Sequence, residues 1–185
     1  AIQWQNDHRA YLREARRKQV PIVQYHYQSA GSLFDRHRYQ KGACVLKMLR
    51  STLGDEAFFQ GISRYLHQHE YQPVEHHDLR LALEAVSGKD LKWFFDQWFR
   101  SPGHPVLDIR QVYDSAQQRV NLIVRQQQDT TTKPVYRLPL TVDVHHGGGK
   151  VTTHQVEVTD ALDTLRFQAA ERPQLLNFDA EKVLL

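Results

Sequence analysis

The sequence of 185 residues has little cysteine and no long apolar run. Its one cysteine, Cys44, excludes an intramolecular disulfide framework and any metal site built on several cysteines. Because no run of about 18 apolar residues is present, no membrane-spanning helix is predicted. No glycine-rich phosphate loop follows a predicted strand, and the Gly-x-Ser-x-Gly elbow of serine hydrolases does not occur. These absences exclude the commonest nucleotide-binding sites and the usual serine nucleophile.

Positive charge is concentrated in the first part of the chain. Residues 1–50 hold ten Lys and Arg against three Asp and Glu, a balance of +7, and the remainder carries −4, which gives the net charge of +3. The basic residues between positions 9 and 18 fit the solvated side of a helix. No nucleic-acid motif and no aromatic stacking platform accompany them. We therefore expect no nucleic-acid partner.

The opening residues carry no targeting pattern. The chain begins with alanine, and its first residues lack the basic-then-apolar order of a signal peptide. We therefore expect a piece of a longer protein, and its location stays open between the cytoplasm and the periplasm.

Two hydrophobic periods divide the chain. Up to Arg100 the pattern is helical, with a first helix capped by Asn6 or Asp7 and a third helix capped by Asp55. The expected helices cover about residues 6–18, 37–53, 57–69, 78–88 and 91–99.

The sequence Ser-Pro-Gly-His-Pro at 101–105 interrupts the helical pattern. Beyond it, short β-branched runs alternate with a period of two, and about seven strands are predicted. Such runs are typical of a small antiparallel β-sandwich. The predicted fold class is α+β, with a helical domain at 1–104 and a sandwich domain at 105–185.

Eleven histidines raise the question of a metal site. The HExxH pattern places two imidazoles on one helical face with a carboxylate between them. His69 and Glu70 begin this pattern, but a proline stands where the second histidine is required. The inverted HxxEH pattern ends in Glu75 and His76, but it begins with a glutamine. Neither zinc-protease pattern is complete.

A looser cluster of histidines remains open to two interpretations. His67, His69, His76 and His77 surround a predicted turn between two helices. They either approach one another and bind a metal ion, or they are exposed polar residues of a loop and a helix start. We favour the second interpretation, so no metal ligand is predicted in this chain.

Several motifs of the helical part carry a family resemblance. A tyrosine, any residue and then Lys-Gly-Ala open an apolar helix that ends in Met-Leu-Arg. These residues are Tyr39, Lys41, Gly42, Ala43, Met48, Leu49 and Arg50. A later tryptophan precedes a Gly-x-Pro turn and an aliphatic residue. These are Trp98, Gly103, Pro105 and Val106. With the upstream Ser-Leu-Phe-Asp sequence, the motifs resemble the M1 family of zinc aminopeptidases over about residues 20–106.

The resemblance implies a fold and a division of labour. The helical part resembles the C-terminal half of the family's thermolysin-like catalytic lobe, and the sandwich resembles the domain that follows it. In this family an HExxH helix and a glutamate on the next helix hold zinc, and a Gly-x-Met-Glu-Asn motif grips the substrate's amino terminus. None of these motifs is in the sequence. We therefore expect zinc in the parent enzyme, with its ligands outside this chain.

Tyr39 matches the family's catalytic tyrosine. A neutral phenol with a pKa of about 10 can donate a hydrogen bond to the oxygen of a carbonyl under attack. The alternative is a tyrosine at a helix start that packs on a neighbour. The resemblance favours the catalytic role, so Tyr39 is the one predicted site residue.

Three residues beside Tyr39 receive no chemical role. Lys41 either pairs with a carboxylate outside the chain or lies on the surface. Gly42 lies within a predicted helix, where glycine costs about 1 kcal/mol relative to alanine, so another backbone is expected close to it. Cys44 falls on an apolar helix stripe and is predicted to be a buried small hydrophobe and not a nucleophile.

These observations favour one function over a second. The first is a downstream fragment of a zinc aminopeptidase, which removes N-terminal residues from peptides; the fragment alone is predicted to be inactive. The alternative is a non-catalytic protein-interaction module on the same scaffold. The expected partners are the missing part of the same polypeptide and, in the parent, peptide substrates. Self-association through the apolar surface of the helical half is also expected.

Overall fold

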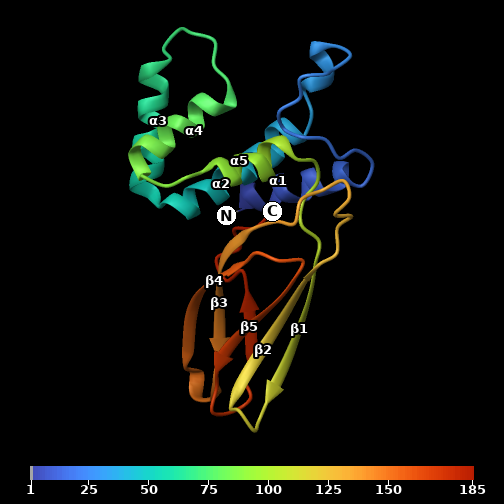
Figure 1. Ribbon diagram of the computed structural model, residues 1–185, viewed down its shortest axis with the longest axis vertical. Helices are drawn as coiled ribbons and strands as arrows, with labels where there is room; N and C mark the ends of the chain where they lie inside the picture. Colours follow the sequence, from blue (N-terminus) through green and yellow to red (C-terminus); the bar gives the residue numbers. More distant parts are fainter. Residues whose placement is uncertain (1) are drawn as a thin grey trace. The chain divides into compact units, whose positions relative to one another are not determined.

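The computed structural model describes residues 2–185 (Figure 1). The chain divides into two compact units. One comprises the residues up to Gly103 together with Leu185, and the other comprises His104–Leu184. The first unit is helical and the second consists of two antiparallel sheets, so the predicted α+β fold class is confirmed.

The helical unit contains the five predicted helices; the second begins with a π-helical turn and the fifth ends in one. The elements are α1 (Ile2–Ala15), the 3-10 turn η1 (Ala30–Leu33), the π-helical turn η2 (His37–Lys41), α2 (Gly42–Leu53), α3 (Asp55–Gln68), α4 (His76–Ser87), α5 (Lys92–Phe95) and the π-helical turn η3 (Asp96–Arg100). Within the described residues no helix combines the length and the apolar character that a membrane span needs.

Helix α1 begins earlier than predicted, so neither Asn6 nor Asp7 caps it. Both residues lie inside the helix. The Gln3 side-chain amide donates to the Asp7 carboxylate at 3.2 Å, and the rings of Trp4 and His8 stack with centroids 5.4 Å apart. These contacts between residues four apart support the first turns of the helix, and they occupy the side chain that was expected to cap it.

Two glycines position helices α2, α3 and α4: one connects α2 to α3, and the other lies where α3 packs on α4. Gly54, between α2 and α3, has φ +83°, a conformation that favours glycine. The guanidinium of Arg50 binds the carboxylate of Asp55 across this joint at 2.7 and 2.8 Å, so Asp55 is the first residue of α3 and not its cap. Further along α3, a Cβ on Gly61 would lie 2.5 Å from Leu83 of α4. The absence of a side chain at Gly61 therefore lets α3 and α4 approach closely.

The aromatic end of the unit forms much of its core. Phe94, Phe95, Trp98 and Phe99 are buried, and the rings of Phe95 and Phe99 stack 4.5 Å apart. The carbonyl of Phe99 also accepts the backbone N–H of Val23 at 2.9 Å. This bond ties the irregular segment that follows α1 to η3.

The second unit is a sandwich of two three-stranded sheets. One sheet has the order β1 (Leu107–Asp114), β2 (Arg119–Gln126) and β5 (Leu162–Gln168), and the other has the order β4 (Val151–Val158), β3 (Leu138–His145) and β6 (Leu175–Phe178). All neighbouring strands are antiparallel. Alternate residues of β2 and β3 are buried, as the period of two predicted. Their apolar side chains form the core between the sheets.

Six strands are described where about seven were predicted. The last apolar run of the chain supplies only β6. After it, the carboxylate of Asp179 accepts the backbone N–H groups of Val183 and Leu184 at 2.9 and 3.0 Å. Because this side chain takes the donors that a strand would offer to a neighbour, the chain closes into a turn.

Candidate functional site

Tyr39 lies in η2, and its side chain is at the surface. The residue is 58% exposed, and its ring stacks on that of Phe34 with centroids 6.3 Å apart. Its backbone N–H donates to the carbonyl of Asp35 at 3.3 Å. No hydrogen bond to the hydroxyl is formed by the described residues. The backbone of Tyr39 is therefore held, while the hydroxyl is accessible to a molecule outside the unit.

Asp35 organises the start of η2. One carboxylate oxygen accepts the backbone N–H groups of His37 and Arg38 at 3.0 and 3.1 Å. The other accepts the Lys18 ammonium and the Arg38 guanidinium, each at 2.6 Å. Burial alone would raise the pKa of Asp35, but the hydrogen bond from Lys18 and the charge of Arg38 outweigh it, and the pKa falls below its usual value. Asp35 therefore acts as an ionised cap.

His37 is fully buried at the first position of η2. Neither ring nitrogen has a hydrogen-bond partner, although Nδ1 lies 3.6 Å from a carboxylate oxygen of Glu14 and 3.8 Å from one of Asp35. Burial lowers the pKa of His37, and the two carboxylates only partly oppose this effect. The imidazole is therefore neutral at pH 7 and packs as an aromatic ring.

Lys41 is fully buried at the last position of η2, which overturns the surface alternative. Its Nζ lies 3.5 Å from the carbonyl oxygen of Ser101 and 5.9 Å from the ring centroid of Tyr11. Burial lowers the pKa of this ammonium to about 7. A cation with so few partners is costly to bury, so the burial of Lys41 close to Tyr39 is not explained by a gain in stability.

The expectation of a close backbone near Gly42 is wrong. A Cβ on this residue would meet nothing within 4 Å in the described structure. Cys44 is fully buried, as predicted, and burial raises the pKa of its thiol to about 11. A thiol that stays protonated and covered at neutral pH is not a nucleophile.

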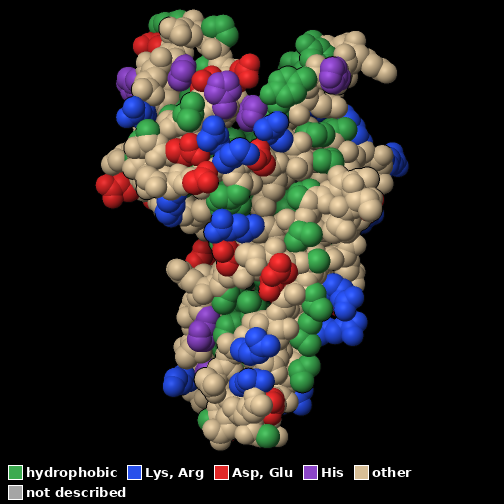
Figure 2. Space-filling view, viewed as in Figure 1, with side chains coloured by type: hydrophobic (Ala, Val, Ile, Leu, Met, Phe, Trp, Pro, Cys, Tyr) green, Lys and Arg blue, Asp and Glu red, His purple; other side chains and the backbone are tan. Residues whose placement is uncertain are grey.

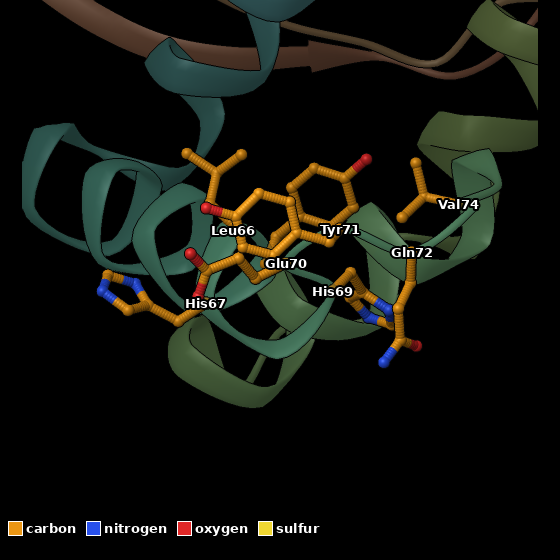
Figure 3. Close-up of a pocket in the computed structure, with 8 residues that line it drawn as sticks. Leu66, His67, His69, Glu70, Tyr71, Gln72 and Val74 are labelled. Atoms are coloured by element: carbon orange, nitrogen blue, oxygen red, sulfur yellow. The ribbon is translucent and has the colours of Figure 1, made fainter.

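The four histidines around the α3–α4 turn do not form one group. Several histidine side chains lie on the surface of this part of the helical unit (Figure 2). The rings of His67 and His69 point to opposite sides of the helix end, beside a surface pocket that Tyr71 and Val74 also line (Figure 3). His67 contacts the carbonyl of Ser63, one turn back in α3, at 2.8 Å.

The start of α4 brings the other two histidines together with a glutamate. His77 lies between Glu75 and Asp78, with its ring nitrogens 3.4 Å from a carboxylate oxygen of each. The Asp78 carboxylate also accepts the backbone N–H of Glu75 at 2.8 Å, as a residue at the third position of a helix does. The arrangement serves the helix start, in agreement with the favoured interpretation.

The donor sets present do not fit a catalytic zinc ion. Among the described residues, two groups offer ligand atoms within 4.8 Å of one another: Glu75, His76 and His77, and Glu14, Asp35 and His37. The first group is largely exposed and serves a helix start. In the second, the Lys18 and Arg38 cations already bind the Asp35 oxygen that faces His37, so a metal ion there would be repelled.

The sequence of the helical unit matches a family model described as the peptidase family M1 domain, over residues 1–98. The chain belongs to peptidase family M1. The matched range includes η2, so Tyr39 and its buried neighbours lie within it.

Relatives in the M1 family cover different lengths of the chain. Tricorn protease-interacting factor F2 of Thermoplasma acidophilum is 43% identical over 77 residues, which are 42% of this chain and 10% of that protein. Leucyl aminopeptidase of Saccharolobus solfataricus is 30% identical over 139 residues, which are 74% of this chain and 16% of that protein. The chain therefore spans between about a tenth and a sixth of the length of these two M1 relatives.

A solved structure shows the same fold. The crystal structure of Legionella pneumophila aminopeptidase A in complex with aspartic acid superposes with a TM-score of 0.72 at 20% sequence identity, over 88% of this chain and 19% of that one. At this identity the match concerns the fold alone, and it extends over both the helices and the sandwich of this M1 chain.

Three residues around Tyr39 escaped the sequence analysis. Asp35 is the last residue of the Ser-Leu-Phe-Asp motif but received no role, and neither Tyr11 nor His37 was predicted to belong to the site. A weak signal existed for Asp35, because an aspartate just before a helix commonly caps it. Nothing in the sequence signals that Tyr11 contacts η2.

Proposed function

We propose that this chain is the downstream part of a zinc-dependent aminopeptidase that removes N-terminal residues from peptides. Membership of family M1, whose aminopeptidases are zinc-dependent, supports the peptidase assignment. The observation that carries the proposal is the exposed side chain of Tyr39 on a turn whose other anchors are buried. The zinc ligands, the water-activating glutamate and the amino-terminus motif belong to the part of the polypeptide outside this sequence.

In this proposal Tyr39 stabilises the transition state. Attack on a peptide carbonyl places negative charge on its oxygen, and a neutral phenol can donate a hydrogen bond to that oxygen at pH 7. The bond strengthens only as the charge develops, so it lowers the barrier more than it improves substrate binding. The capped backbone of η2 keeps the donor in place before the substrate arrives.

The experiment compares the longer parent protein with its Tyr39→Phe variant on an aminoacyl p-nitroanilide. Loss of one preorganised donor typically reduces turnover by about 100-fold or more, and KM should change little. An unchanged kcat would remove Tyr39 from the mechanism. Trp4→Leu, which alters α1 away from η2, is the matched control and should keep its kcat.

The chain alone is proposed to be inactive. It should neither hydrolyse the same substrate nor bind zinc stoichiometrically, which calorimetry can measure. The upstream sequence of the parent separates the enzyme from the non-catalytic interaction module. An HExxH motif with a downstream glutamate supports the enzyme, whereas substituted ligands support the module.

The missing part of the polypeptide is the proposed partner of the helical unit. Tyr25, Tyr27 and Phe34 are 66%, 54% and 73% exposed, and hydrophobic side chains are visible on this unit in Figure 2. Exposed aromatic groups in such proximity along a chain favour burial against another surface. In the absence of the missing part, self-association is expected, and a clean monomer in sedimentation at high concentration would contradict it.

A further inference from the structure

The η2 turn buries its two ends and exposes its middle. His37 and Lys41, at its first and last positions, are fully buried, whereas Tyr39 between them is 58% exposed. π-Helical turns recur at functional sites, where an irregular backbone sets the direction of a side chain. The direction of Tyr39 therefore depends on how firmly the two buried ends are held.

The side chains of the two buried ends are not held firmly by hydrogen bonds, although their backbone N–H groups donate to Asp35 and Arg36 at 3.0 and 2.9 Å. Both ring nitrogens of His37 lack a partner, and the Lys41 ammonium has the Ser101 carbonyl oxygen at 3.5 Å. A hydrogen bond of this length is weak. The positions of the two side chains must therefore come from packing.

One aromatic ring contacts both ends. The ring of Tyr11, a fully buried residue of α1, meets the imidazole of His37 edge to face, with centroids 5.3 Å apart and planes at 88°. The ammonium of Lys41 lies 5.9 Å from the same ring centroid, within the range of a cation–π contact. Because the two side chains have few hydrogen bonds, these two contacts with the Tyr11 ring hold them in place.

Tyr11 is itself tied to a third segment. Its hydroxyl donates to the carbonyl oxygen of Gly103 at 3.1 Å. The same helix also binds the entrance of η2, because Glu14 accepts the backbone N–H of Arg36 at 3.1 Å and the carbonyl of Ala10 accepts its guanidinium at 3.3 Å. Tyr11 is thus the central contact between α1, the two ends of η2 and the turn that ends at Gly103.

We propose that Tyr11 is a positioning residue for Tyr39: its ring braces His37 and Lys41, and thereby fixes the direction in which η2 presents the Tyr39 hydroxyl. This inference rests on the proposed catalytic role of Tyr39. Tyr11 is fully buried, so it is assigned no direct contact with the substrate. A displacement of a catalytic group by about 1 Å can reduce turnover by about 100-fold, so bracing has a measurable effect.

Two substitutions separate the effect of the Tyr11 ring from the effect of its hydroxyl. Tyr11→Phe keeps the ring and removes the bond to Gly103, and Tyr11→Leu removes the ring. In the full-length parent enzyme, Tyr11→Leu should lower kcat about tenfold and Tyr11→Phe about threefold, with KM nearly unchanged. Trp4→Leu, in the same helix but away from η2, should retain the kcat of the parent.

The deciding measurement repeats each Tyr11 substitution in the Tyr39→Phe background. If Tyr11 acts through Tyr39, its substitution should lower kcat there by less than twofold. An equal factor in both backgrounds would overturn the inference while leaving the role of Tyr39 intact. An unchanged kcat in Tyr39→Phe alone would instead overturn the proposed function. If Tyr11→Leu does not fold, the comparison of Tyr11→Phe in the two backgrounds decides in the same way. An unchanged kcat in Tyr11→Phe would contradict the inference.

Discussion

The η2 turn and the α3–α4 turn both collect histidines and charged residues, but they are built differently. At η2, Asp35 binds Lys18 at 2.6 Å and Lys41 approaches Ser101, so some of the partners come from segments far apart in the chain. At the start of α4, His77 and its carboxylate partners lie within three residues of one another. Local groups of this kind are what a helix start needs. Burial of the Lys41 ammonium with one weak hydrogen bond costs stability, and such a cost is typical of functional sites.

Removing the carboxylate that organises each turn should give the largest difference. In Asp35→Ala, two cations and two backbone N–H groups lose their partner, and the free energy of unfolding should fall by about 2–3 kcal/mol. In the matched variant Asp78→Ala, one backbone N–H and the exposed His77 ring lose a contact, and the loss of stability should be a fraction of that. Urea unfolding of the chain measures both. Equal losses would show that η2 is no more than an ordinary helix start.

The buried lysine should make the stability of the chain depend on pH. Below pH 7 Lys41 is protonated in both states; above it the folded state loses the proton, since its pKa is about 7, while the unfolded state keeps it up to a pKa of about 10.4. The unfolded state then binds more protons, so the free energy of unfolding should rise between pH 7 and about 8.5 by up to about 1.4 kcal/mol per pH unit.

Two variants isolate this dependence. Lys41→Met should remove the rise, whereas Lys92→Met, at an exposed lysine of α5, should keep it. Above about pH 8.5 the thiol of Cys44 has the opposite effect, because its folded pKa is raised to about 11 and the unfolded state loses its proton first. The same slope in Lys41→Met and in the parent chain would contradict the account of η2.

Two glycines should respond to alanine with opposite and smaller effects. Gly61→Ala places a methyl group 2.5 Å from Leu83 and should destabilise the α3–α4 pair by about 1–2 kcal/mol. Gly42→Ala adds a methyl group to helical backbone with nothing within 4 Å, and should stabilise the chain by about 0.5–1 kcal/mol. Thermal unfolding measures both signs. Destabilisation by Gly42→Ala would indicate a contact at η2 that the structure does not contain.

The parts of the fold that sequence could predict are those with local causes. The helical periods and the alternation along β3 depend on neighbouring residues, and the structure confirms them. The start of α1 and the number of strands were wrong, because the Asp7 and Asp179 side chains bind groups that the local pattern did not reveal.

The candidate site could be predicted only in part. Tyr39 was predicted from a motif and stays a prediction. The burial of Lys41 depends on Ser101, sixty residues away, and on the Tyr11 ring in another helix. A local pattern carries no information about such pairings. The same reason explains why the burial of Lys41 was not predicted, and why the residue was left between a carboxylate partner outside the chain and the surface.

The most direct test of the account concerns the proposed hydrogen bond from the Tyr39 hydroxyl to the oxyanion. A phosphinic dipeptide analogue resembles the tetrahedral transition state, whereas a substrate amide does not. In the full-length parent, Tyr39→Phe should raise the inhibition constant of this analogue by about 100-fold or more. The substitution should lower kcat/KM by the same factor. Unchanged affinity for the analogue in Tyr39→Phe would contradict the account.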